Sequence, residues 1–434
     1  MDKIQRNKFL SKFYVEQLFI ILIPISAIFS IFALELLLLF ITLSFILRNI
    51  FNLEKIFFLN KFVFIFTLFY FYLLARYFLN INYSDESYLF VIFYFRYGLY
   101  VIAVFYFLSK VNDLENKFLQ SVILCVTILI TDGLIQFIFG KNLFGNLIVD
   151  NNRVTSFFGN ESILGSYLIK VLPFVFLFLL KNFSFKKKIF ILPLIIFSLI
   201  LIFLSGERAA VILSFFMIFY LFVFIKKLRL PIIITTIISI FFVVLIFFNS
   251  ENIKQRYIQT INEVVNSKIL KPNFFDKEKE RLNNEILEKS PIFGNFYIVS
   301  PTHNNYFITA FNMFKSNIFF GHGPKSFRVL CSDEKFKVNI WSCSTHPHNY
   351  YIQLLSEFGI IGFIFPFIIF LFFIYKSFAT FFSENIDPEK VFFCAIIVNL
   401  WPLTTTGNFF NNWISILIYL PISFYLLNLK INDK

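Results

Sequence analysis

Residues 351–375 read YIQLLSEFGIIGFIFPFIIFLFFIY, and they follow directly on the polar sequence Cys343-Ser344-Thr345-His346-Pro347-His348-Asn349-Tyr350. An apolar stretch of this length can cross a bilayer as an α-helix, which needs about 20 residues. All four histidines lie between His303 and His348, in the only long polar region of the chain. Titratable imidazoles at a boundary between water and lipid indicate chemistry at a membrane surface.

The composition of the whole chain predicts an all-α polytopic membrane protein. Of its 434 residues, 58% are hydrophobic and 15% are charged, whereas soluble domains carry about 25% charged residues. The apolar runs lack the alternation of barrel strands, so helices are expected. We predict about twelve spans, with approximate limits 14–29, 31–47, 56–79, 88–109, 118–139, 161–180, 189–204, 209–225, 231–248, 350–375, 391–406 and 409–428.

The charge pattern sets the expected topology. Nine spans fall within residues 1–248, a long polar segment covers 249–349, and three spans fall within 350–434. Lys and Arg gather in alternate loops, which predicts that both termini are cytoplasmic and that residues 249–349 lie on the periplasmic side. The first apolar run lacks a cleavage site and is interpreted as a membrane anchor. The net charge of +13 is spread over short loops, which argues against nucleic-acid binding.

The cysteines fit this topology. Cys331 and Cys343 both fall in the segment expected outside, while Cys125 and Cys394 lie in apolar spans. An oxidising compartment would allow a disulfide between Cys331 and Cys343. The alternatives are two free thiols, or a zinc site shared with the histidines, although the spacing matches no standard zinc motif.

The sequence His346-Pro347-His348-Asn349 is the first candidate catalytic element. Proline is favoured in the first turn of a helix, so we expect a helix to start here. The positive end of that helix would keep the His348 ring neutral and available as a base. The alternative is that both histidines are interfacial caps without a catalytic role.

Arg208 is the first candidate anion ligand, in the turn Leu204-Ser205-Gly206-Glu207-Arg208. A guanidinium at membrane depth is costly unless paired, and its planar fork suits a diphosphate. A contact with Glu207 or a lipid headgroup is the alternative. Arg153 is a second candidate ligand, and Glu161 would either complement a helix dipole or orient a substrate hydroxyl.

The sequence Gly321-His322-Gly323-Pro324 predicts a tight structural turn, after which Arg328 would add positive charge to the site. No phosphate-binding loop, dinucleotide-binding fingerprint or acidic metal-binding pair is apparent. The use of nucleotide energy is therefore not expected, and no cofactor is predicted.

Three of these segments resemble the O-antigen ligase/polymerase superfamily. They are Ser205-Gly206-Glu207-Arg208-Ala209-Ala210, the Gly321–Arg328 turn, and Thr345-His346-Pro347-His348-Asn349 followed by Leu354 to Gly362. The resemblance is densest over about residues 190–375. It implies a GT-C-like, metal-independent, inverting glycosyltransferase of the bacterial inner membrane, with its active site facing the periplasm. The donor would be an undecaprenyl-diphosphate-linked glycan. The acceptor would be another lipid-linked repeat in a polymerase or lipid A–core in a ligase, and polymerase is preferred here.

The resemblance also assigns roles to residues. Arg208 would hold the diphosphate, and His348 would accept the proton of the acceptor hydroxyl, with His346 as the other candidate. The family often has an arginine upstream of the Gly-x-Gly-Pro turn, where this chain has His303, so Arg328 or Arg153 would substitute. A transporter or flippase is the alternative of another class, but it predicts ionisable residues along a path through the midplane. Here such residues crowd the outer boundary.

Overall fold

The computed structural model describes residues 13–49, 61–79, 89–148, 153–181, 185–258 and 301–432. The regular elements among these residues are helices, and the only β-type pairing among them is an isolated bridge between Lys141 and Leu147. Eight described helices are long and apolar enough to cross a membrane, and three more are shorter and apolar. The predicted class, an all-α polytopic membrane protein, is confirmed, while the number of twelve spans stays a prediction.

The N-terminal helices follow the predicted spans closely. The turn expected near Ser30 separates the first two helices, and its side-chain Oγ accepts a hydrogen bond from the Ala33 amide at 3.1 Å. The helices are α2 (Tyr14–Phe29), α3 (Ile31–Asn49), α5 (Lys61–Leu79), α6 (Leu89–Ile92), α7 (Phe95–Lys110) and α8 (Leu114–Phe139). The span predicted over 88–109 is thus two helices, α6 and α7.

The remaining elements are η3 (Ser156–Phe158), α9 (Leu164–Lys181), α10 (Phe185–Leu204), α11 (Arg208–Phe224), η4 (Lys226–Leu228), α12 (Arg229–Asn249), α15 (Pro301–Ser316), α16 (Phe327–Leu330), α17 (Tyr350–Ala379), α18 (Asp387–Asn399) and α19 (Asn412–Asn432). The span predicted over 391–406 is wrong at its end, because α18 stops at Asn399 and residues 400–411 form a loop. Within the polar segment 249–349, residues 259–300 lie outside the described part of the chain.

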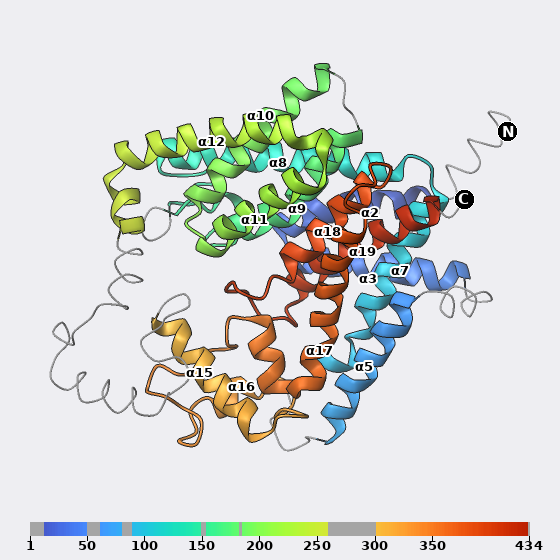
Figure 1. Ribbon diagram of the computed structural model, residues 1–434, viewed down its shortest axis with the longest axis vertical. Helices are drawn as coiled ribbons and strands as arrows, with labels where there is room; N and C mark the ends of the chain where they lie inside the picture. Colours follow the sequence, from blue (N-terminus) through green and yellow to red (C-terminus); the bar gives the residue numbers. More distant parts are fainter. Residues whose placement is uncertain are drawn as a thin grey trace.

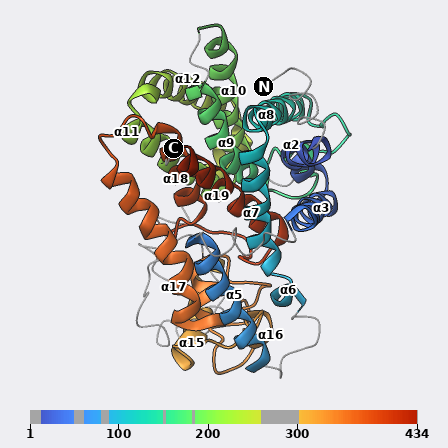
Figure 2. The same ribbon diagram turned by 90° about the vertical axis from the view of Figure 1, so that its right-hand side faces the viewer.

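The helices form two groups, as Figures 1 and 2 show. Helix α9 packs against α8, α10, α11 and α18, and α19 packs against α7 and α18. Helix α17 reaches beyond this bundle, where α15 and α16 lie beside it together with α5 (Figure 1). The histidine-rich part of the sequence is therefore held at the junction between the bundle and the smaller group.

Helix α17 is broken at Gly359. This residue has φ 64° and ψ −167°, a conformation that essentially only glycine adopts. A Cβ atom there would lie 2.3 Å from the Phe319 carbonyl oxygen, so the break allows two backbones to touch. Across the contact, the Gly323 amide donates to the Glu357 carbonyl oxygen at 2.7 Å and the Ile360 amide donates to the Ile318 carbonyl oxygen at 2.8 Å. The Gly321–Pro324 turn is thereby attached to the middle of α17.

Two side chains of α5 complete this junction. The Tyr72 hydroxyl donates to the Phe358 carbonyl oxygen at 2.5 Å, and the Arg76 guanidinium donates to the Gly321 carbonyl oxygen at 2.9 Å. A broken helix in an apolar environment leaves carbonyl groups that need partners. The turn and α5 supply those partners. Their hydrogen bonds fix the direction of the first half of α17 and of the loop before it, residues 343–349, which we call the histidine loop.

Candidate active site

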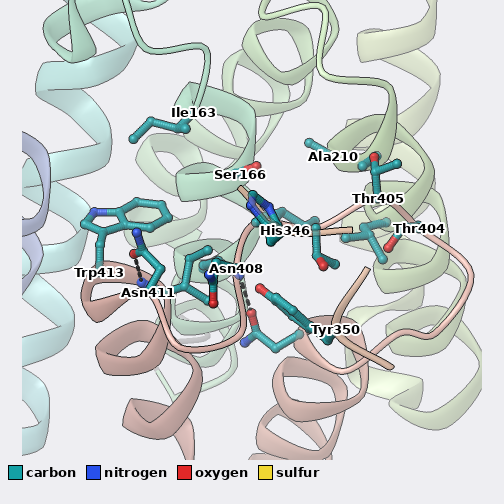
Figure 3. A pocket seen from close by; sticks show the side chains of 18 of the residues that line it. Ile163, Ser166, Ala210, His346, Tyr350, Thr404, Thr405, Asn408, Asn411 and Trp413 are labelled. Carbon is teal, nitrogen blue, oxygen red and sulfur yellow. Dashed lines mark hydrogen bonds between the residues drawn. The ribbon is translucent and has the colours of Figure 1, made fainter. Parts of the chain in front are cut away.

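The described structure has a cavity of about 460 Å³. The loops that meet around it are those that the distribution of Lys and Arg predicts on the periplasmic side. Its walls come from the segment before α9, from α9 and α11, from the loop before α17, and from residues 398–414. Figure 3 shows the His346 ring in its centre, between Ser166 on one side and Asn408 and Tyr350 on the other. Glu161, Lys170 and Arg328 also line it.

The histidine loop ends in a helix cap, which corrects one expectation. Helix α17 begins at Tyr350, and the Asn349 side chain accepts hydrogen bonds from the Tyr351 amide at 3.0 Å and the Ile352 amide at 3.1 Å. Asn349 is therefore the N-cap, and Pro347 and His348 lie before the helix and not in its first turn. His348 has φ 58°, an uncommon left-handed conformation for a residue with a side chain. Such backbone strain concentrates at functional sites.

The loop between α18 and α19 holds the histidine loop in place. The Asn349 Nδ2 atom donates to the carbonyl oxygens of Pro402 at 2.8 Å and Thr404 at 3.0 Å. The Thr406 amide donates to the His348 carbonyl oxygen at 2.8 Å. This loop was missed in the sequence because it was assigned to a span. The polar run Thr404-Thr405-Thr406-Gly407-Asn408 is the signal that could have found it.

Three of the four histidines gather here. The ring centroids of His346 and His348 are 4.1 Å apart, and those of His303 and His348 are 5.3 Å apart. The fourth, His322, lies against Phe336, and its Nε2 atom is 2.9 Å from the Met313 carbonyl oxygen. His322 therefore has a structural role between α15 and the turn before α16.

The environment of the three rings favours the neutral imidazole. Burial, together with repulsion from His348 when that ring is protonated, lowers the pKa of both His303 and His346 to about 4, and burial lowers the pKa of His348 itself. The His346 Nδ1 atom is 2.9 Å from the Thr345 hydroxyl. Its buried Nε2 atom has no partner in hydrogen-bond geometry. The nearby Thr406 backbone raises the pKa of His346, but burial lowers it by more. A neutral ring with an available nitrogen can accept a proton.

Three arginines surround the turn between α10 and α11. Gly206 has φ 69°, and a Cβ atom there would lie 2.9 Å from Arg256 Nη1 and 3.2 Å from Arg153 Cγ. Burial lowers the pKa of Arg256, and the charges of Arg153 and Arg208 lower it further. Three positive charges thus lie close together, and Arg153 also acts on the nearby Glu207 carboxylate, so a ligand anion would be attracted to the group as a whole.

Arg256 was not predicted. It lies in the described helical segment 251–258 that follows α12, and its Nη2 atom donates to the Phe203 carbonyl oxygen at 3.4 Å. The neighbouring Tyr257 ring stacks on Phe203 with centroids 4.6 Å apart, which anchors this segment over the turn. In the sequence, a single arginine soon after a predicted span does not by itself indicate an anion-binding residue. Arg256 lies upstream of the Gly321–Pro324 turn and of His303 along the chain.

Glu207 connects the arginine turn to α9. Its carboxylate accepts hydrogen bonds from the Gly165 amide at 2.6 Å, the Ser166 amide at 3.0 Å and the Ser166 hydroxyl at 2.5 Å. Burial raises the pKa of Glu207 to about 7. Glu161 was expected at a helix start, but α9 begins only at Leu164. Glu161 lies in the preceding turn and is exposed to the cavity.

The predicted site residues all lie in this region. The charge of Arg208 lowers the pKa of His303, the His303 ring contacts His348, and His348 contacts His346 at the cavity. The charge of Arg328, which also lines the cavity, lowers the pKa of His346. The histidines thus lie close to Arg208 and to the cavity, an arrangement that can place a base beside an anion site.

Cys331 and Cys343 are joined by a disulfide, with their Cα atoms 5.1 Å apart. It links the end of α16 to the start of the histidine loop, beside a small core of Ala310, Met313, Phe327 and Phe336. Cys125 and Cys394 are free and buried. In the described part of the chain, no group of three or more His, Cys, Asp or Glu side chains is arranged to hold a metal ion.

Fold and site together define a helical, multi-pass membrane protein with a polar cavity where its helices end. Residues 193–367 match the family model described as O-antigen ligase. The matched segment contains Arg208, His303, Arg328, His346 and His348, and the match confirms the resemblance to the O-antigen ligase/polymerase superfamily. The family supports an activity of the O-antigen ligase or polymerase type, with a lipid-linked glycan and an acceptor as substrates. No curated protein matches the chain.

Proposed function

We propose that this protein is a glycosyltransferase of the bacterial inner membrane that polymerises O-antigen or related repeats from an undecaprenyl-diphosphate-linked donor. In this proposal the chain spans the membrane about twelve times, both termini are cytoplasmic, and the cavity opens to the periplasm. The observation that carries the proposal is the cluster of His303, His348 and the cavity-lining His346, with Arg208 near enough for its charge to lower the pKa of His303.

The arginine group would hold the leaving diphosphate. Charge develops on this group as the bond to the anomeric carbon breaks, and preorganised guanidinium groups stabilise it where water is partly excluded. Arg208, Arg153 and Arg256 lie together around Gly206, so their charges converge on one region. No metal ion is needed for this role.

The histidines would activate the acceptor. His348 is the proposed base, and His346 is the second candidate because its ring lines the cavity. The lowered pKa of each ring keeps it unprotonated at neutral pH. The deprotonated hydroxyl would attack the anomeric carbon on the face opposite the diphosphate, and the configuration would invert.

The test is transfer by the purified protein in lipid nanodiscs, with a lipid-diphosphate oligosaccharide as donor. A ladder of longer lipid-linked glycans is the expected product, and transfer only to lipid A–core would indicate a ligase. No transfer to either acceptor would exclude both activities. His348→Ala and His346→Ala should each be compared with His322→Gln, which removes an imidazole outside the site and should leave the rate per folded molecule unchanged.

A further inference from the structure

Lys170 lies at the cavity wall and has no role in the proposed chemistry. Its Nζ atom donates to the Asn399 side-chain oxygen at 2.8 Å, which uses one of the three ammonium protons. Among the described residues, no carboxylate lies within ion-pair distance of Nζ. Glu207 acts on it electrostatically, but the Glu207 carboxylate is already bonded to the Gly165 and Ser166 amides.

An ammonium group enclosed by apolar helices is costly without a counter-ion. Among the side chains that line the cavity, Lys170 and Arg328 are positive and Glu161 is negative, while the Glu207 carboxylate acts on Lys170 from behind Ser166. A carboxylate in the cavity would give the Lys170 ammonium a direct ion pair.

The rest of the lining is suited to a sugar ring. Trp413 lines the cavity, and its Nε1 atom donates to the Ala27 carbonyl oxygen at 2.8 Å, which fixes the orientation of the indole. Asn408 and Asn411 lie near it, and Thr404 and Thr405 lie across the cavity, as Figure 3 shows. A flat aromatic face with a few placed amides and hydroxyls is typical of a site that orients a polyhydroxylated ligand.

We infer that the cavity binds a sugar that carries a carboxylate, with the carboxylate against Lys170 and the ring beside Trp413. This inference rests on the proposed function and names the chemical class of its acceptor: an acidic monosaccharide unit, such as a hexuronic acid, at the end that receives the new bond. Its hydroxyl groups would then lie next to His346, which lines the same cavity.

A phosphate group is the other anion to consider. The arginine group around Gly206 combines the guanidinium groups of Arg153, Arg208 and Arg256, which fits the multiple charges of a diphosphate. Lys170 offers a single ammonium with a neutral amide beside it. The arginine group thus fits the diphosphate of the donor, and Lys170 fits a carboxylate of the acceptor.

The test measures binding and needs no turnover. The full-length protein in nanodiscs is titrated with an oligosaccharide that ends in glucuronic acid and with its carboxyl-reduced counterpart, which ends in glucose. We expect the acid to bind about tenfold more tightly, as a charge-assisted hydrogen bond would give, and Lys170→Gln to remove this preference. The control Lys181→Gln removes the same charge from the other end of α9, where Lys181 pairs with Glu115 at 2.5 Å, and should keep the preference.

Three outcomes would overturn the inference. The first is equal binding of the two oligosaccharides, and the second is equal loss of the preference for the acid in the two lysine variants. In the third, Lys170→Gln weakens only the binding of undecaprenyl diphosphate that carries a neutral glycan. The last result would mean that Lys170 contacts the diphosphate. Failure of the proposed function would be seen separately, as absence of glycan transfer by the unmodified protein. The preference for the carboxylate could still be measured in that case, because the binding experiment needs no transfer.

Discussion

The imidazole rings of His303 and His348 meet edge to face, with centroids 5.3 Å apart and planes inclined by 78°. One comes from α15 and the other from the loop before α17. The Tyr306 ring stacks on His348 from the same side, one turn along α15 from His303. The position of the proposed base therefore depends on α15 as well as on its own loop.

The lowered histidine pKa values predict activity at mildly acidic pH. The proposed base should stay neutral below its ordinary pKa of 6.5, so the acid limb of the transfer rate should lie clearly below pH 6.5. Stability should follow the same direction. His303 and His346 contribute fully above pH 6.5, and their contribution is lost as pH falls from 6.5 towards 4. Rate and thermal unfolding across pH 4–8 would check this, and a limb at or above pH 6.5 would contradict it.

Gly359→Ala should disrupt the break in α17. The new methyl group would meet the Phe319 carbonyl oxygen at 2.3 Å in a backbone conformation closed to alanine, so we expect a loss of about 3 kcal/mol or more. Gly145→Ala is the matched control, because Gly145 also has a positive φ but no atom near the new group. It should cost only about 1 kcal/mol. Thermal unfolding in detergent compares the two, and equal losses would be inconsistent with the contact.

Two variants of Asn349 should separate its two functions. Asn349→Asp keeps the oxygen that caps α17 but loses the donor that holds Pro402 and Thr404. We expect nearly normal helix stability and a strong loss of transfer. Asn349→Ala should lose the cap as well, at a cost of about 1 kcal/mol. Full activity in the Asp variant would show that the loop contact is dispensable.

Arg256→Gln should reduce transfer by about 10- to 100-fold, since one guanidinium would no longer stabilise the developing charge. Arg256→Lys should recover part of the loss because the charge is kept. Lys254→Gln removes a cation from the same segment, where Lys254 pairs with Glu251 at 3.5 Å, and should have little effect. The measurement is kcat and KM for the lipid-linked donor. Equal effects of Arg256→Gln and Lys254→Gln would argue against a specific role.

The disulfide should make activity sensitive to reductants. Reduction frees the loop between Cys331 and Cys343 and loosens the approach to the histidines, with a cost of about 2–4 kcal/mol. The double variant Cys331→Ser, Cys343→Ser should be less stable, and its rate should not respond to dithiothreitol. A rate in the unmodified protein that is equally insensitive would contradict this prediction.

Hydropathy and motif analysis located most of the helices because a span of about 20 apolar residues is read directly from composition. They also selected Arg208, because a permanent charge is unusual at a membrane boundary, and the histidine loop, because its side chains titrate near neutral pH. Arg256 and the loop after α18 were missed for a physical reason. Their contribution arises from contacts between distant segments, such as Arg256 with the Gly206 turn and Asn349 with Pro402. Single-sequence patterns carry no information about such contacts.

The bonds from Asn349 to Pro402 and Thr404 also bear on the order of events during synthesis. The ribosome completes the histidine loop well before the segment that secures it, and α19 must follow for that segment to be anchored at both ends. Under the proposed function, we therefore expect a nascent chain to stay inactive until its last helix is inserted. A chain that terminates after α18 would keep most of the bundle and lack a competent centre.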